Sequence, residues 1–196
     1  MNWKKWLSLI SDYIALPLLA ASLLVNVALY DKSAHCNEIS IQQEDAYITA
    51  RLTEYIGEVT RYGYGDYSEF LAKIYVSAAK EFNVDPYLLV AIGDPESKYT
   101  LHAVSSAGAM GVQQVMPFWV KEIPFLKSSR DLLNPELNIR ASAYIVAHYK
   151  ELCGAEAKYI LKCYHGGPKA LKNPKASTLA YVQDVLNARE IIVYEL

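Results

Sequence analysis

A stretch of 18 residues from Tyr13 to Tyr30 contains no charged side chain, and it constrains this chain more than any other feature. As an α-helix it would be about 27 Å long, close to the thickness of the hydrocarbon core of a bilayer. Trp3 and Trp6 precede it and Tyr30 closes it, as expected of aromatic residues at both membrane interfaces. The two lysines between the tryptophans predict that the N-terminus lies in the cytoplasm.

The competing interpretation is a cleaved signal peptide, whose apolar region is normally about 7–15 residues long and ends in an A-x-A-like site. The uncharged stretch is longer, and the sequence that follows it, ALYDKSAHC, offers no such site. An uncleaved anchor is therefore favoured, with the signal peptide as the alternative. We expect a cytoplasmic stub and transmembrane anchor over residues 1–30, a linker over 31–44 and a folded domain over 45–196 on the periplasmic side.

The composition limits the kind of partner that the domain binds. The chain has 196 residues, of which 53% are apolar, enough for one domain with a substantial core. Its net charge of −2 gives no basis for a nucleic-acid partner. Its 16 tyrosines combine a flat apolar face with a hydroxyl, which suits amphipathic ligands such as sugars. Basic residues are scattered apart from the N-terminus and a cluster at Lys169, Lys172 and Lys175.

Apolar residues after Tyr30 recur at helical spacing, and no alternating stretch is long enough for a sheet, which predicts an all-α domain. Asp66 with Glu69 resembles a capping box, while Asp85-Pro86 and Asn134-Pro135 are start signals. The expected helices cover residues 48–59, 66–82, 86–92, 134–154, 156–164 and 179–191, with a short helix opening at Pro117.

Three cysteines follow the uncharged stretch. Cys153 and Cys163 flank Gly154, where a helical hairpin would bring them together, so in an oxidising compartment they would form a disulfide. Two buried free thiols are the alternative. Cys36 is then the unpaired cysteine.

Glu96 is the candidate for chemistry. Gly93 and Pro95 disfavour a continuing helix, so the third helix is expected to run into Gly93 and to end near Glu96. The loop SSAGAMG lets the backbone approach a ligand, and Gln113 and Gln114 add amide groups. Apolar neighbours would raise the pKa of the acid, which a general acid for a glycosidic oxygen requires at neutral pH. A solvated Glu at a helix end is the alternative.

The stretch KEFNVDPYLLVAIGDPESKYTLHAVSSAGAMGVQQVMP resembles the signature of lytic transglycosylases of the soluble (family 1) type, peptidoglycan-cleaving enzymes with a goose-lysozyme-like helical fold. The resemblance lies in VDPYLLVAI, in Glu96-Ser97, in AVSSAGAMG and in Gln114 with Met116-Pro117. CYHGGP resembles the family's tyrosine-asparagine-glycine-proline segment, and STLAYVQDVL resembles its closing tyrosine-valine helix. Together these motifs cover residues 67–185 in the family's order.

The resemblance implies a reaction that needs no cofactor. Glu96 would protonate the glycosidic oxygen between N-acetylmuramic acid and N-acetylglucosamine in a peptidoglycan strand. It would then act as a base on the muramyl C6 hydroxyl, so that a 1,6-anhydro ring forms. The family does without a second carboxylate because the N-acetyl group of the substrate stabilises the positive charge.

The resemblance also implies roles for residues around the acid. Gln114 and Met116 would line the muramyl subsite, Tyr164 would hold the acid or the sugar, and Tyr181 would close the cleft. Three further residues are candidates for substrate binding: Ser97, Ser105 and His165. For the two serines the alternative is that they satisfy backbone groups at a helix end and in a loop.

The chain departs from the family at several positions. Gln113 replaces a methionine, His165 replaces an asparagine and Ser177 replaces an acid. His165 would bind the peptide or the sugar differently, or be structural. Gly93-Asp94-Pro95 is expected to distort a helix that is continuous in the family.

The main hypothesis is a transglycosylase that opens the wall locally for an envelope-spanning system or a phage. Two alternatives to it remain. In a hydrolytic muramidase, Asp94 would be the required second carboxylate, although a solvent-facing Asp94 is favoured. The other alternative is a weakly active glycan-binding scaffold subunit with protein partners in an envelope-spanning complex. No metal site is expected, because the four histidines show no ligand spacing with the cysteines.

Overall fold

The computed structural model describes residues 26, 38–60 and 65–196, and it divides the chain into two compact units, residues 1–45 and 46–196. In the first unit, residues 26 and 38–45 are helical. The predicted anchor falls, except for residue 26, outside the described residues, as does half of the predicted linker, residues 31–37. No helix within the described ranges is long and apolar enough to cross a membrane.

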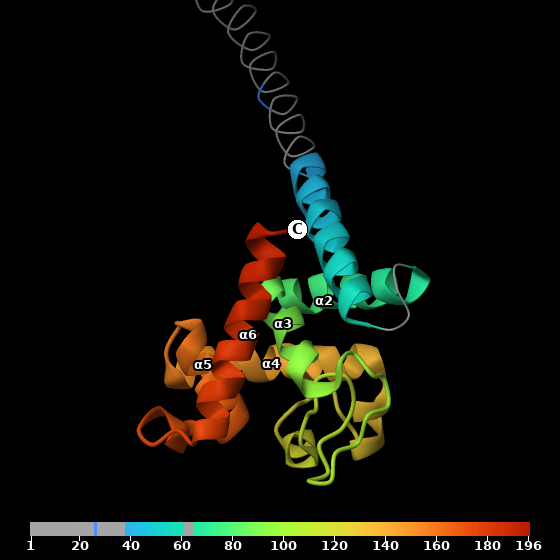
Figure 1. Cartoon of the computed structure of the whole chain (residues 1–196). Helices are drawn as coiled ribbons and strands as arrows, with labels where there is room; N and C mark the ends of the chain where they lie inside the picture. The colour runs from blue at the N-terminus through green and yellow to red at the C-terminus, as the bar shows by residue number, and fades with distance from the viewer. Residues whose placement is uncertain (1–25, 27–37, 61–64) are drawn as a thin grey trace, which may run out of the picture. The chain divides into compact units, whose positions relative to one another are not determined.

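The second unit is built from helices (Figure 1). Residues 46–59 are helical. The elements that follow are α2 (Asp66–Glu81), α3 (Pro86–Ser97), η1 (Pro117–Lys121), η2 (Ser129–Leu133), α4 (Pro135–Cys153), α5 (Ala157–Gly166), η3 (Pro168–Leu171) and α6 (Ala176–Tyr194). In this part of the chain, β-pairing is limited to isolated bridges of Met110 with Val104 and Val115. The prediction of an all-α domain is confirmed for the described residues of this unit.

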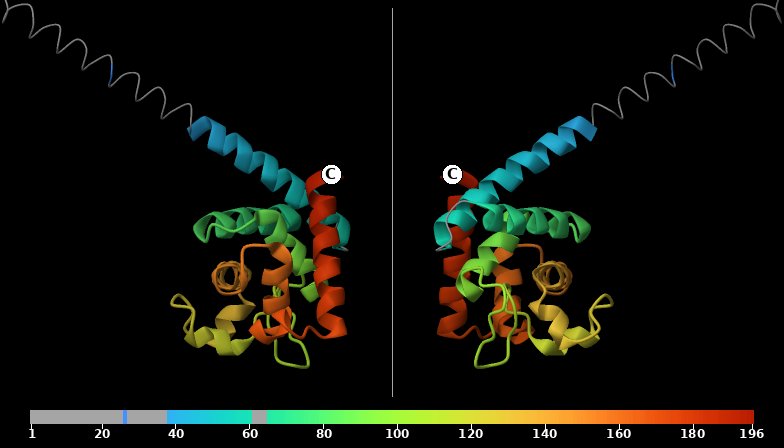
Figure 2. Two further views of the ribbon diagram at one scale, coloured as in Figure 1. Left: turned by 90° about the vertical axis from the view of Figure 1, so that its left-hand side faces the viewer. Right: turned by 90° about the vertical axis from the view of Figure 1, so that its right-hand side faces the viewer.

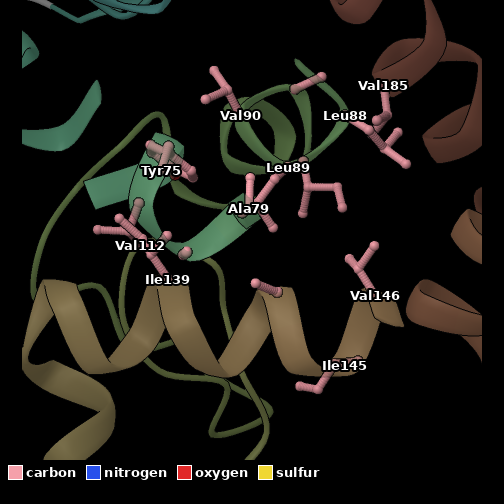
Figure 3. Packing of buried hydrophobic residues seen from close by; sticks show 14 of the residues in the cluster. Tyr75, Ala79, Leu88, Leu89, Val90, Val112, Ile139, Ile145, Val146 and Val185 are labelled. Atoms are coloured by element: carbon pink, nitrogen blue, oxygen red, sulfur yellow. The ribbon is translucent and has the colours of Figure 1, made fainter. Parts of the chain in front are cut away.

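Helix α3 lies at the centre of the core, between α2, α4 and α6 (Figures 1 and 2). Each residue from Leu88 to Ile92 is at most 3% exposed. A helix that is apolar on all sides must be covered on all sides. Figure 3 shows side chains from α2, α3, α4 and α6 meeting in this core. The middle of α3, just before the turn that carries Glu96, is therefore held from several directions.

Local capping signals account for two of the helix starts. Asp85 accepts hydrogen bonds from the backbone N–H groups of Tyr87 and Leu88, at 2.9 and 3.3 Å. Asn134 accepts one from Leu137 at 3.0 Å, so both predicted starts are confirmed. The predicted capping box at Asp66 is wrong, because α2 begins at Asp66 itself and its N-cap, Gly65, has no side chain to bond.

Helix α3 continues through Gly93 and Pro95 to Ser97, so its predicted end near Glu96 is confirmed, whereas the predicted interruption at Gly93 is wrong. A Cβ atom at position 93 would lie 2.7 Å from Tyr75 Oη and 2.8 Å from Tyr99 Cε1. Glycine is thus needed because two buried tyrosines press against the helix. Their burial outweighs the helix propensities of glycine and proline.

Cys153 at the end of α4 and Cys163 in α5 form a disulfide bond, which decides between the two alternatives for these cysteines. The bond joins α4 to α5 across the turn at Gly154. Cys163 is followed directly by Tyr164, so the covalent link is adjacent to a predicted site residue.

Candidate active site

Glu96 lies in the last turn of α3 with its carboxyl group partly buried. Its Oε1 accepts a hydrogen bond of 2.8 Å from the hydroxyl of Tyr181 in α6. Burial raises the pKa of Glu96 to about 7, against the lowering effect of the Tyr181 hydrogen bond. The carboxyl group therefore holds its proton near neutral pH, and it has a hydrogen-bond donor ready to stabilise its ionised form.

Tyr181 is buried, and the ring of His165 covers it. The two ring centroids are 4.5 Å apart, with 33° between the planes. His165 Nδ1 lies 3.2 Å from Thr178 Oγ1, one turn before Tyr181 in α6. Burial against these neighbours lowers the pKa of His165, which favours a neutral imidazole. His165 is thus placed beside the partner of the acid, at the edge of the site.

Tyr164 in α5 is also close to Glu96, whose negative charge adds to burial in raising the pKa of this phenol. Its hydroxyl donates to the backbone oxygen of Gln113 at 3.0 Å and lies 2.9 Å from Ser142 Oγ. The loop after α3 and helix α4 therefore fix the position of Tyr164.

A pocket of about 290 Å³ adjoins this cluster through Tyr164 and His165. Gln114 and Met116 are in its walls, as are the aromatic residues Phe118, Trp119 and Tyr149. The amide of Gln114 donates to the backbone oxygens of Ala103 and Gly111, at 3.2 and 2.8 Å. The structure thus brings Gln114, Met116, Tyr164 and His165 to one pocket, next to the pair of Glu96 and Tyr181.

Residues 74–186 match the protein family described as the transglycosylase SLT domain. The chain belongs to this family. The match covers α3, the loop after it and the start of α6 through Tyr181, so the whole arrangement around Glu96 lies within the SLT domain.

Solved structures of soluble lytic transglycosylases share this fold. An inactive mutant of lytic transglycosylase Slt from Pseudomonas aeruginosa, in which a glutamate is replaced by glutamine, is 26% identical, with a TM-score of 0.57 over 62% of this chain. The 70-kDa enzyme of Escherichia coli is 20% identical, with a TM-score of 0.56 over 65% of this chain. The complex of the 70-kDa enzyme with bulgecin A is also 20% identical, with a TM-score of 0.59 over 66% of this chain.

This chain covers only 23%, 26% and 25% of the chains in those three structures, about a quarter of their length. The family resemblance read from the sequence is confirmed. The likeness at 20% identity supports the fold alone.

Gln113 has a different role in this SLT domain from the one expected. It is fully buried, and its side chain faces the core instead of a ligand. Its Nε2 donates to Tyr75 Oη at 2.6 Å and to the backbone oxygen of Leu89 at 3.1 Å. Its Oε1 accepts from Ser142 Oγ at 3.2 Å. The amide is fully paired, which is why a polar residue is accommodated in the core.

Asn138 and Ser142, both in α4, are functional neighbours that the sequence did not single out. Asn138 Oδ1 accepts from the backbone N–H of Gln113 at 2.8 Å, and its Nδ2 donates to the backbone oxygen of Met110 at 2.8 Å. Both side chains are fully buried. The detectable signal was two polar residues one turn apart on the apolar face of the helix.

Ser97 and Ser105 stabilise the loop of the SLT domain. Ser97 Oγ donates to the backbone oxygen of Val112 at 2.7 Å and accepts from Thr100 N at 3.1 Å. Ser105 Oγ accepts from Ala109 N at 3.0 Å. The structure thus favours the alternative in which both serines satisfy backbone groups.

Asp94 is engaged elsewhere. It accepts a hydrogen bond of 2.7 Å from the hydroxyl of Tyr55 and forms an ion pair with Lys98. It lines a second cavity, of about 370 Å³, together with Asp184 and Asn187. Two residues apart on a helix point in nearly opposite directions, so Asp94 does not share the surroundings of Glu96. In the part of the chain that the structure describes, no three His, Cys, Asp or Glu side chains converge as a metal site.

Proposed function

We propose that this chain is a peptidoglycan lytic transglycosylase. It cleaves the β-1,4 bond between N-acetylmuramic acid and N-acetylglucosamine and leaves 1,6-anhydromuramyl ends. The observation that carries the proposal is Glu96: a partly buried carboxyl group with a pKa of about 7, paired with Tyr181 inside an SLT domain. Further support comes from the similar Pseudomonas aeruginosa enzyme, whose mutant with glutamine in place of a glutamate is inactive.

The chemistry follows from one carboxyl group used twice. Protonated Glu96 donates its proton to the bridging oxygen as the bond from muramyl C1 breaks. The N-acetyl group of the substrate stabilises the positive charge at C1. The C6 hydroxyl oxygen then bonds to C1, and its proton passes to the Glu96 carboxylate, which restores the acid.

Tyr181 stabilises the intermediate state of the enzyme. Its hydrogen bond to Glu96 Oε1 strengthens once the carboxyl group has lost its proton. Gln114 and Met116 line the pocket from the side of the loop after α3, Tyr164 lines it from α5, and we assign this space to the muramyl residue and its substituents. The loop bonds of Ser97 and Ser105 keep that side of the pocket in place.

A hydrolytic muramidase is the less favoured alternative. A usual hydrolase of this kind needs a second carboxylate opposite the acid. Asp94 is held by Tyr55 and Lys98 at another cavity, which argues against that role. A glycan-binding scaffold is the remaining alternative.

We place the domain on the periplasmic side of a membrane, anchored through residues 1–30, where it opens the wall locally for an envelope-spanning system or a phage. Two observations support this placement: the uncharged stretch from Tyr13 to Tyr30, and the disulfide of Cys153 with Cys163, which suits an oxidising compartment.

Product analysis tests the proposed reaction. Purified cell wall is digested with the chain, and the released fragments are analysed by mass spectrometry. We expect anhydro ends from the wild type and from Asp94→Asn, and no release by Glu96→Gln with its fold retained. Reducing ends that depend on Asp94 would establish the muramidase, and absence of release by the wild type would leave the scaffold.

A further inference from the structure

The two segments that hold the remaining predicted site residues contain no acidic residue. The first segment, residues 97–121, contains Ser97, Ser105, Gln114 and Met116. The second segment, residues 157–183, contains Tyr164, His165 and Tyr181. Neither segment has an Asp or Glu, although the whole chain has 21 and a net charge of −2. Glu96 lies directly before the first segment. The two segments themselves, which form most of the pocket, contain no acidic residue.

These segments carry seven lysines: Lys98, Lys121, Lys158, Lys162, Lys169, Lys172 and Lys175. Lys98 is paired with Asp94, and Lys158 with Glu156. The last three, which we call the lysine rim, are exposed and form no ion pair with another described residue. The rim is therefore a local excess of positive charge on a chain that is acidic overall.

The lysine rim lies next to the pocket. His165 and Gly167 line the pocket, and Lys169 follows two residues later in η3. Lys172 ends η3, and Lys175 is the N-cap of α6. This segment connects α5, which carries Tyr164, to α6, which carries Tyr181 (Figure 1). Lys169 thus follows the pocket lining by two residues, and Lys172 and Lys175 lie further along the same connection between the two site helices.

We propose that the lysine rim binds the carboxylates of the peptide arms carried by the glycan strand, so that the enzyme selects peptide-bearing strands over bare ones. This inference rests on the proposed function and adds a specificity to it. In an intact strand the lactyl carboxyl of each muramyl residue is bound in an amide, so the sugar chain is uncharged, whereas the peptide arms carry free carboxylates. Walls free of acid avoid repelling those arms, and exposed lysines attract them over about a Debye length.

The test compares two substrates with the whole 196-residue chain. One is cell wall with intact peptides, and the other is glycan strands from which an amidase has removed the peptides, which leaves a single lactyl carboxylate per disaccharide where an intact arm carries several. The variant is the triple change Lys169→Gln, Lys172→Gln and Lys175→Gln. Three exposed charge interactions correspond to about a tenfold fall in the ratio of the two cleavage rates at low salt. Added salt should lower the wild-type ratio towards that of the variant.

A second triple variant, Lys73→Gln, Lys127→Gln and Arg130→Gln, removes the same charge elsewhere and should keep the wild-type ratio. The inference is overturned if the rim variant keeps its ratio, or if the control variant loses it equally. If the wild type cuts neither substrate, the proposed function fails separately. Sedimentation of the Glu96→Gln chain with intact cell wall, with and without the rim substitutions, then decides the inference, and equal binding would reject it.

Discussion

The hydroxyl of Tyr181 lies 2.8 Å from Oε1 of Glu96 and donates a hydrogen bond to it. This bond favours the ionised acid, while burial favours the protonated acid, and the pKa of about 7 is the balance between them. An acid that must both give and take back a proton benefits from such a balance.

The pH dependence of activity should follow Glu96. The reaction needs the protonated form, so the rate should fall about tenfold per pH unit above the pKa of about 7. In Tyr181→Phe the lowering effect of the hydrogen bond is lost, so this limb should move upward by about one pH unit or more. Below neutral pH the variant should be about tenfold slower, because its carboxylate is less stabilised. Tyr194→Phe, an exposed change on the same helix, is the control for a pH–rate series.

The stability of the fold should also depend on Glu96, because burial raises its pKa from 4.5 to about 7. Between these values the folded chain binds more protons than the unfolded chain, so the free energy of unfolding falls as pH rises. Glu96→Gln does not titrate and should be more stable than the wild type by about 2–3 kcal/mol at pH 8. Below pH 4.5 the two should converge. Urea denaturation across this range measures the difference in the free energy of unfolding. A difference that does not change with pH would contradict the raised pKa of Glu96.

Gly93→Ala should destabilise the domain even though alanine favours helices. The new methyl group would meet Tyr75 and Tyr99, at 2.7 and 2.8 Å. We expect a loss of about 1–3 kcal/mol in thermal or urea unfolding. Gly65→Ala, where no atom lies within 4 Å, should cost no more than about 0.5–1 kcal/mol, because alanine is a poorer N-cap than glycine, and equal losses would argue against a packing cause.

Ser142→Ala should leave Gln113 Oε1 buried without its donor and remove one partner of Tyr164. The expected cost is about 1–3 kcal/mol in the free energy of unfolding. Adding Gln113→Met, an apolar change of similar length, removes the stranded amide. The double variant should therefore lose less than the sum of the two single variants, and a strictly additive cycle would show that the two side chains do not interact.

Reduction of the disulfide between Cys153 and Cys163 should lower stability. The bond closes a short loop with a sequence separation of 10, which corresponds to about 2–3 kcal/mol in the chain-entropy model. Tm should fall by about 5–10 °C on adding a reductant. In a variant with serine at both positions, the reductant should have no further effect.

The sequence predicted the helix starts well, because the signal of each start is local. Asp85-Pro86 and Asn134-Pro135 supply a cap and a preset backbone within a few residues of one another. The interruption of α3 was predicted wrongly, because the need for Gly93 comes from Tyr75 and Tyr99, which approach from outside the helix. Tertiary contacts of this kind leave no periodic signal.

Part of the site could be predicted from the sequence for a similar reason. Glu96 and its loop follow one another in the chain, and Tyr164 and Tyr181 lie in motifs that resemble the family's. The sequence did not predict that the side chains of Gln113 and Gln114 point in different directions. Gln114 has a φ of 46°, in the left-handed region, which turns it towards the pocket side while its neighbour enters the core. Only the folded loop determines this.

The attachment of that loop to Asn138 has a consequence for how a long polymer reaches the enzyme. Gly111 fits so closely against α4 that a Cβ atom would lie 2.4 Å from Asn138 Nδ2, and the backbone at Met110 and Gln113 is bonded to the same side chain. A segment fastened at its midpoint does not swing aside like a gate. We therefore expect a strand to settle sideways onto a surface that is already formed, at any point along its length and without waiting for a free end.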